Sequence, residues 1–191
     1  GIMISASHNP YYDNGIKLIN GQGEKMEDAV IDLVEAYLDG TPATLPYAKQ
    51  DAIGRSVDYS AGRNRYVGYL ISLSRFSFKG MKVGLDCSTF QNAKIIFDAL
   101  GAKTYVISNA PDGTNINMGC GSTHIEALQQ HVRENHLDIG FAFDGDADQC
   151  LAVDETGKLV DGDLILYLCG RHLQQTGMLD DTKIVTTVMS N

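Results

Sequence analysis

The chain has 191 residues, of which 43% are hydrophobic and 20% are charged. This composition indicates one or two globular α/β units with real cores and excludes a disordered protein. The formal net charge of −9 argues against nucleic acid or an anionic membrane as a partner, so an anionic substrate must be met by a metal ion or a few local cations. No run is long enough to span a bilayer, and no signal peptide is recognisable.

The cysteines show no CxxC pairing, and two of them lie inside apolar runs, which is typical of reduced thiols in a cytoplasmic protein. Neither a zinc site nor a disulfide framework is therefore expected. The chain starts at Gly1, inside an apolar strand-like run, and it stops soon after a last expected helix and strand. We therefore expect an internal segment of a longer protein.

The first stretch predicts a buried strand at residues 1–4 that runs into a serine-rich loop at residues 5–10, where Asn9-Pro10 indicates a turn. Asn14-Gly15 indicates a tight turn, and Lys17 lies on the strand that leaves it. By themselves, Ser7 and His8 fit a polar turn as well as a nucleophile or phosphate site. The chain has no GxSxG elbow that would indicate a hydrolase.

Two helices are expected next. Residues 24–38 form an amphipathic pattern that Asp39-Gly40 ends, and a polar connector follows at residues 41–58. Ser60 is in position to cap a second helix that ends near Ser74. Residues 75–80 form the expected boundary between domains.

From residue 81 the pattern becomes strand, helix, strand, helix, strand. Residues 81–87 and 103–108 are the first two strands, and Thr123 with Glu126 forms a capping box before the second helix. Such an order implies parallel strands with right-handed crossovers, and it places the loop after the third strand at a carboxyl end, where ligands collect in α/β proteins.

That loop carries Asp144, Asp146 and Asp148 directly after an apolar run. Like charges so close together repel, and a hard cation with oxygen ligands relieves the repulsion, so Mg²⁺ or Ca²⁺ is expected here. An EF-hand is the alternative, because Glu155 falls at loop position twelve. Against it, position six is Gln149 where an EF-hand needs Gly, and the flanking segments read as strands.

After residue 157 we expect a short strand, a helix capped by Asp161, and one more strand at residues 183–189. Together the patterns divide the chain into residues 1–78, 79–155 and 156–191. The last part is too short to close a domain of its own.

Five stretches resemble motifs of the α-D-phosphohexomutases: residues 5–10 (SASHNP), 12–17 (YDNGIK), 112–117 (DGTNIN), 119–124 (GCGSTH) and 144–148 (DGDAD). The second and fourth are similar to the branch that acts on glucosamine phosphates. The resemblance implies α/β domains with mixed, largely parallel sheets between helices. In that scheme the three parts of the chain are the end of domain 1, most of domain 2 and the start of domain 3.

The resemblance also implies a chemistry. It assigns a phosphoserine to Ser7, proton transfer to Lys17, and a place in the same loop to His8. It assigns one Mg²⁺ ion to four residues: Ser7, Asp144, Asp146 and Asp148. The implied enzyme interconverts glucosamine 6-phosphate and glucosamine 1-phosphate through a bisphosphate, for amino-sugar and cell-wall precursor synthesis in the cytoplasm.

Three departures from the family pattern bear on this expectation. Gln149 stands where an arginine is usual and cannot supply its charge, Ala147 stands where glycine is usual, and residues 88–91 (STFQ) replace a different turn. A phosphoglucomutase or phosphomannomutase would share Ser7 and the aspartates, and a non-catalytic metal- or phosphosugar-binding relative would accommodate Gln149. Because much of a four-domain enzyme is missing, we expect the 191 residues alone to be inactive.

Overall fold

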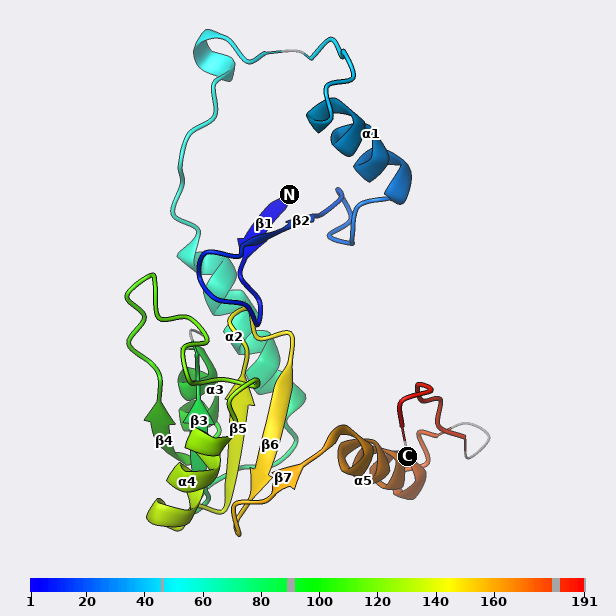
Figure 1. Cartoon of the computed structure of the whole chain (residues 1–191). Coiled ribbons are helices and arrows are strands. Elements are labelled where there is room, and N and C mark those ends of the chain that lie inside the picture. Colours follow the sequence, from blue (N-terminus) through cyan, green and yellow to red (C-terminus); the bar gives the residue numbers. More distant parts are fainter. Residues whose placement is uncertain (46, 89–91, 180–182, 191) are drawn as a thin grey trace.

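The computed structural model describes residues 1–45, 47–88, 92–179 and 183–190 (Figure 1). In chain order, the elements are β1 (Ile2–Ser5), β2 (Gly15–Leu18), α1 (Asp28–Leu38), the 3₁₀ turn η1 (Gln50–Ala52), α2 (Ser60–Leu73), β3 (Lys82–Asp86), α3 (Asn92–Ala99), β4 (Lys103–Ile107), α4 (Glu126–Asn135), β5 (Ile139–Phe143), β6 (Cys150–Asp154), β7 (Leu159–Val160) and α5 (Gly162–Gln175). Within these ranges, no helix has the length and hydropathy to cross a bilayer.

The main sheet has the strand order β4-β3-β5-β6-β7. β3 pairs in parallel with β4 and with β5, whereas β6 pairs antiparallel with β5 and β7 antiparallel with β6. The predicted parallel strand–helix unit is confirmed, and so is the α/β class with a mixed sheet. The predicted domain division stays a prediction, although β7 hydrogen-bonds to the sheet of the middle part.

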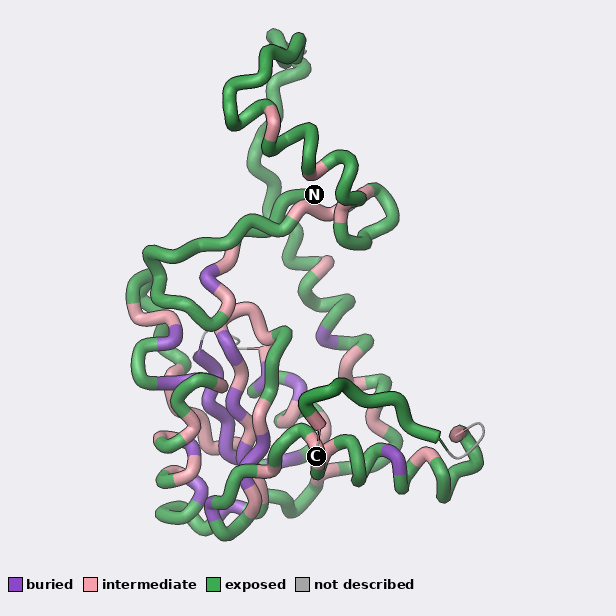
Figure 2. The backbone as a smooth tube through the Cα atoms, turned by 45° about the vertical axis from the view of Figure 1, so that its right-hand side comes forward, coloured by how far each residue is buried: buried purple, intermediate pink, exposed green. Residues whose placement is uncertain are grey.

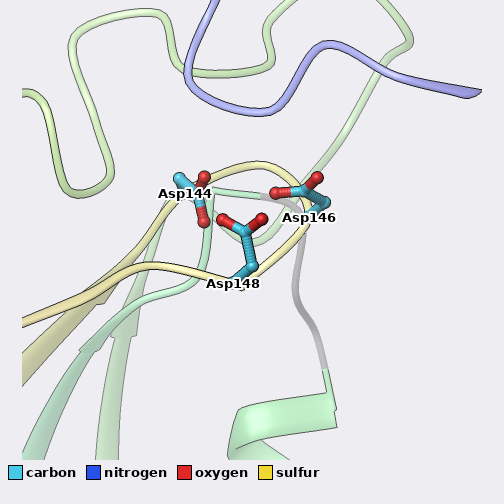
Figure 3. Close-up of side chains that lie close together, drawn as sticks. All are labelled: Asp144, Asp146 and Asp148. Carbon is cyan, nitrogen blue, oxygen red and sulfur yellow. The ribbon is translucent and has the colours of Figure 1, made fainter. Parts of the chain in front are cut away.

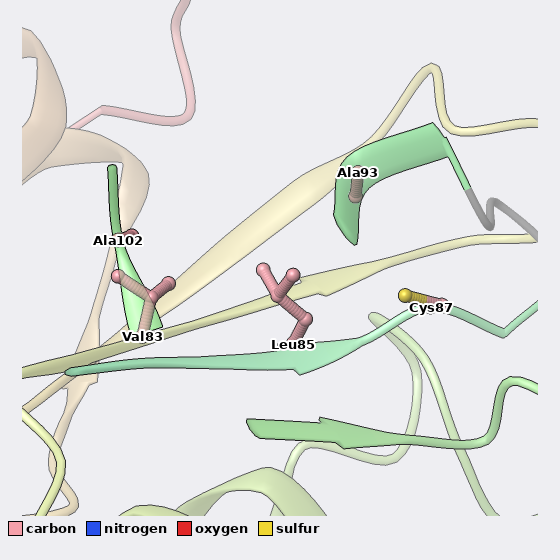
Figure 4. Close-up of a cluster of buried hydrophobic side chains, with 5 residues drawn as sticks. All are labelled: Val83, Leu85, Cys87, Ala93 and Ala102. Carbon is pink, nitrogen blue, oxygen red and sulfur yellow. The ribbon is translucent and has the colours of Figure 1, made fainter. Parts of the chain in front are cut away.

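One face of this sheet packs under α3. Val83 and Leu85 of β3 and Cys87, directly after it, occupy alternate positions, so their side chains leave the same side of the strand, toward Ala93 at the start of α3 (Figure 4). Leu85 and Cys87 are fully buried. Phe97 of α3 stacks on Phe141 of β5, so this face contributes an apolar core to the unit.

The opposite face packs under α4 through two glycines that are neighbours in the sheet, Gly84 and Gly140. A Cβ at Gly140 would lie 2.7 Å from Val132 and 3.0 Å from Leu128, the buried side chains of α4. The missing side chains therefore let α4 approach the strands closely. Because alternate residues of β3 face α3 and α4, the two helices cover opposite faces.

The N-terminal part is a separate hairpin above the sheet, joined to it by the long connector and α2 (Figure 1). β1 and β2 pair antiparallel from Ile2 with Leu18 to Ser5 with Gly15. The prediction of a buried first strand is wrong, because Ile2 is 70% and Ile4 is 67% exposed. Figure 2 shows the contrast, with buried residues concentrated in the main sheet and its helices.

Several predicted helix ends need correction. α1 begins at Asp28, four residues later than predicted, because Lys25 makes a β-bridge with Ile19. Ser60 is the first residue of α2 rather than its cap, and its backbone N–H is held by the side chain of Asp58. The predicted end of α2 near Ser74 is confirmed.

Of the two other predicted caps, one is wrong and one is confirmed. The capping box of Thr123 and Glu126 does not form, since Ile125 is at the N-cap of α4 without a side-chain cap bond. Asp161 does cap α5, where its carboxylate accepts the backbone N–H of Leu164 at 2.9 Å.

The predicted strand at residues 183–189 is wrong. These residues form no strand and instead lie beside α5, where a Cβ on Gly170 would overlap the side chain of Ile184. Val185 and Val188 are almost fully exposed. An apolar run forms a strand only when another strand offers it hydrogen bonds, and no described strand borders this segment. The turn at residues 88–91 departs from the family pattern, and its residues 89–91 lie outside the described ranges.

Candidate functional site

The aspartate loop, residues 144–149, joins β5 to β6 at the carboxyl end of β5. Within it, the backbone N–H of Gln149 donates to Asp144 Oδ1 at 3.1 Å and that of Ala147 donates to the Asp144 carbonyl at 3.1 Å. β4 and β5 flank β3, and their connections cross opposite faces. The loop therefore lies at the switch point of the sheet, where α/β proteins bind ligands.

The three aspartate side chains point toward one another (Figure 3). Asp144, Asp146 and Asp148 each offer a ligand oxygen, and these oxygens lie within 4.8 Å of one another. Burial, together with the charges of its two neighbours, raises the pKa of Asp144, although hydrogen bonds from Gln149 and Ser7 oppose the rise. The site is thus short of positive charge.

A divalent cation fits this set of donors. Oδ1 of Asp146 is buried and has no hydrogen-bond partner among the described residues, which leaves a carboxylate oxygen available for a ligand bond. Carboxylate oxygens are the ligands that Mg²⁺ and Ca²⁺ prefer. The EF-hand alternative is wrong, because strands β5 and β6 flank the loop and Glu155 lies in the turn at the far end of β6.

Lys17, on β2, contributes positive charge from the N-terminal part. Its ammonium lies 2.8 Å from Asp146 Oδ2 and 2.9 Å from Asp148 Oδ2. The hydrogen bond to Asp146, followed by that to Asp148, raises the pKa of Lys17 well above its usual value. Burial works to raise the pKa of Asp146, but the contacts with Lys17 outweigh it and hold that pKa below its ordinary value.

Ser7 comes to the same place from the serine loop. Its hydroxyl donates to Asp144 Oδ2 at 3.2 Å and lies 3.3 Å from Nδ1 of His8. Ser7 has a φ of 51°, a left-handed conformation that is uncommon for serine. The side chain of Ser5 holds the turn, because its Oγ accepts the Ser7 N–H at 2.9 Å. The structure therefore brings all the predicted site residues together, while their catalytic and metal-binding roles stay predictions.

Sequence reasoning missed two residues at the junction, which is the contact between the serine loop (residues 5–10) and the aspartate loop (residues 144–149). Gly145 donates its backbone N–H to the Ser7 carbonyl at 3.0 Å, and a Cβ there would lie 2.7 Å from that same oxygen. Asn117 donates its side-chain N–H groups to the Ser7 and Asn9 carbonyls. The signal for Asn117 was its place in the motif at residues 112–117, which by itself does not indicate a contact.

Two of the three family departures lie in the aspartate loop. Ala147 has a φ of 58°, which is the left-handed region where glycine is the unstrained residue. Gln149 supports Asp144 through its backbone N–H and contributes no charge to the site.

Comparison with known proteins indicates the family of the chain. The family model for phosphoglucomutase/phosphomannomutase, alpha/beta/alpha domain I, matches residues 1–43. Curated phosphoglucosamine mutases from Lachnospira eligens, Lachnoclostridium phytofermentans and Streptococcus gordonii are 63%, 61% and 50% identical, with each alignment covering 100% of this chain. The chain belongs to the phosphohexomutase family. It spans 43% of the length of each of these relatives.

Solved structures show the same fold for this phosphohexomutase chain. A phosphoglucomutase/phosphomannomutase family protein from Burkholderia thailandensis aligns with a TM-score of 0.70 at 24% identity, over 92% of this chain and 38% of that one. A phosphomannomutase-like protein from Thermus thermophilus aligns with a TM-score of 0.70 at 17% identity, over 93% of this chain and 41% of that one. The predicted family and fold are confirmed.

Proposed function

We propose that the chain is part of a phosphoglucosamine mutase, an isomerase that interconverts glucosamine 6-phosphate and glucosamine 1-phosphate. One observation carries the proposal: the Ser7 hydroxyl lies 3.2 Å from Asp144, in a cluster of three carboxylates able to hold a cation. The identity of 50–63% to curated phosphoglucosamine mutases over the whole chain supports this sugar.

In this proposal Ser7 carries the phosphoryl group on Oγ. The bond from phosphorus to Oγ breaks as a bond to a sugar hydroxyl forms, the hydroxyl loses its proton, and Oγ regains one. The product is a hexosamine 1,6-bisphosphate, which returns its other phosphoryl group to Ser7 after it turns over in the site. An Mg²⁺ ion held by Ser7, Asp144, Asp146 and Asp148 would spread the negative charge of the transferring group.

The protons are assigned to the two basic side chains of the site. His8 Nδ1 is 3.3 Å from Ser7 Oγ, within reach for exchange of the Oγ proton. Lys17 is proposed to act at the sugar hydroxyl. Its contacts with Asp146 and Asp148 raise its pKa, so Lys17 is protonated in this arrangement and must lose that proton before it can accept the proton of the sugar hydroxyl.

Intact mass of the full-length protein tests the proposal. The wild type is expected to carry a phosphoryl group that Ser7→Ala lacks, while the matched variant Ser56→Ala, at an exposed position in the connector, keeps it. Absence of the phosphorylated species even after incubation with a hexose 1,6-bisphosphate would contradict the enzyme function and favour a binding protein, the alternative that Gln149 supports.

Sugar specificity needs a second measurement. The matched family model covers phosphoglucomutases and phosphomannomutases, which is the observation behind that alternative. Turnover of glucosamine, glucose and mannose phosphates by the full-length protein is expected to favour glucosamine. A wide preference for glucose 1-phosphate would overturn the assignment.

Two further points belong to the proposal. The described cysteines are all free thiols, which suits a cytoplasmic enzyme with a small phosphosugar as its partner. Because the chain spans 43% of its curated relatives, we expect the 191 residues alone not to turn over substrate.

A further inference from the structure

The turn that presents Ser7 is held by a residue far away in the sequence. Asn117 lies in the loop between β4 and α4 and is 7% exposed. Its side-chain Nδ2 donates to the Ser7 carbonyl at 2.6 Å and to the Asn9 carbonyl at 2.9 Å. Both amide hydrogens are thus used on the two carbonyl groups that flank His8 in the turn.

Asn117 is itself fixed to the core of the main sheet. Its Oδ1 accepts the hydroxyl proton of Ser88 at 2.9 Å, and its backbone N–H donates to the same hydroxyl at 3.3 Å. Ser88 is 3% exposed and follows β3, where its N–H donates to buried Asp86 at 3.4 Å. Every donor and acceptor of the Asn117 side chain therefore has a partner, and the chain of contacts ends at a core strand.

The Ser7 turn needs such support. Ser7 has a φ of 51°, and a non-glycine residue keeps a positive φ only where the surroundings determine it. The Ser7 carbonyl accepts two hydrogen bonds from loops of the main sheet unit, one from Asn117 and one from the Gly145 N–H at 3.0 Å. The hairpin that carries the turn is largely exposed, and the hydrogen bonds within the turn, from the Ser7 N–H to Ser5 Oγ and from the Asn9 N–H to the Ala6 carbonyl, do not connect it to the sheet unit.

We propose that Asn117 is a positioning residue, which clamps the Ser7 turn onto the aspartate loop and so orients Oγ toward Asp144. Asn117 is bonded to the backbone of the turn and not to the Ser7 hydroxyl, so it acts through Ser7. The catalytic consequence of this role rests on the proposed function. Holding the reacting groups in the correct geometry is a large part of phosphoryl-transfer catalysis.

Asn117→Asp in the full-length protein tests the clamp. Aspartate has the same shape and also tolerates a positive φ, but it removes both N–H donors and turns a carboxylate oxygen toward two carbonyls. The matched control is Asn115→Asp, the same change two residues away, where the side chain bonds only within its own loop, to Asp112 and Ala110.

For Asn117→Asp, kcat is expected to fall at least about tenfold, while KM for glucosamine 1-phosphate stays within about twofold. Asn115→Asp should leave both constants close to wild type. Hydrogen exchange at residues 5–10 should become faster in Asn117→Asp alone. A kcat close to wild type, or an equal loss in the two variants, would overturn the proposal.

Failure of the proposed function would appear differently, as a wild-type protein without mutase activity. The exchange comparison still decides the clamp in that case. Faster exchange at residues 5–10 in Asn117→Asp but not in Asn115→Asp supports it, and equal exchange in the two variants rejects it.

Discussion

The two parts of the molecule that meet at the site are built differently. The sheet unit from β3 to β7 has a buried core on both faces. In residues 1–58, by contrast, Ala6 is the one described residue that is buried, at 3% exposure. Because Ala6 precedes Ser7, the most buried point of the N-terminal part is where its serine loop packs against the aspartate loop. The aspartates have a rigid support, whereas Ser7 depends on contacts from the other part.

The largest expected effect tests the core itself. Leu85 is fully buried on β3, and Leu85→Ala should lower the free energy of unfolding of the 191-residue chain by about 2–5 kcal/mol, because it leaves a cavity. Leu33 of α1 is 71% exposed, so the same substitution there should change the stability by less than about 0.5 kcal/mol. Urea unfolding followed by circular dichroism measures both. Equal losses of unfolding free energy in the two variants would show that the N-terminal part has a core that contributes as much to stability as the core of the sheet unit.

The second prediction breaks the junction. A Cβ on Gly145 would lie 2.5 Å from Ile116 Cδ1 and 2.7 Å from the Ser7 carbonyl oxygen, so Gly145→Ala must push the serine loop away. We expect a loss of about 1–3 kcal/mol in unfolding free energy and at least about a tenfold loss of phosphoryl transfer in the full-length enzyme.

The control for this change is Gly21→Ala, where a Cβ would meet nothing within 4 Å. Gly21 lies in the N-terminal part, away from the junction contacts described above. Phosphoserine content and turnover of the two variants give the answer. If Gly145→Ala transfers phosphate as fast as Gly21→Ala, close docking of the two loops is not required.

The same comparison explains what the sequence could predict. The aspartate loop was recognisable because three carboxylates follow an apolar run at alternate positions, and the order of strands and helices placed it at a carboxyl end. The contact between Ser7 and Asp144 joins residues 137 positions apart, and no local pattern encodes it. The family resemblance alone brought these residues together before the structure was known.

Burial was the other property that sequence patterns predicted poorly. The apolar run of β1 predicts a buried strand, yet Ile2 and Ile4 are exposed, because burial needs a partner surface that the pattern does not contain. The segment at residues 183–189 failed as a strand for the same physical reason, since strand hydrogen bonds need a neighbour. Within the sheet unit, where partners are close in sequence, the predicted elements are confirmed.

The third prediction concerns charge at the junction. Asp146→Asn should weaken Mg²⁺ binding at least about tenfold, since it removes a charged oxygen ligand. It should change the stability of the metal-free protein by less than about 1 kcal/mol, because Lys17, whose side chain is 48% exposed, keeps its ion pair with Asp148 and repulsion within the cluster is relieved. Calorimetric titration with Mg²⁺ and thermal unfolding in a chelator measure the two effects.

Glu155→Gln is the matched control, because Glu155 is exposed at the far end of β6 and would be the twelfth-position ligand of an EF-hand. It should leave Mg²⁺ affinity unchanged. A metal-free Asp146→Asn protein that unfolds much more readily than wild type would contradict the view of the cluster as a site of repulsion.

The smallest expected effect sharpens the idea that the aspartate loop is the rigid partner. Ala147 has a φ of 58°, and alanine in this conformation is disfavoured relative to glycine, so Ala147→Gly should stabilise the chain by about 1 kcal/mol. Ala127→Gly in helix α4 should instead destabilise it by about 0.5–1 kcal/mol, since glycine there only adds freedom to the unfolded state. Opposite signs in urea unfolding would show that the aspartate loop holds backbone strain, as a well-supported loop is able to do. A loss of stability in both variants would mean that the aspartate loop relaxes around Ala147 and holds no backbone strain. In that case the aspartate loop, like the Ser7 turn, would depend on the contact between the two loops.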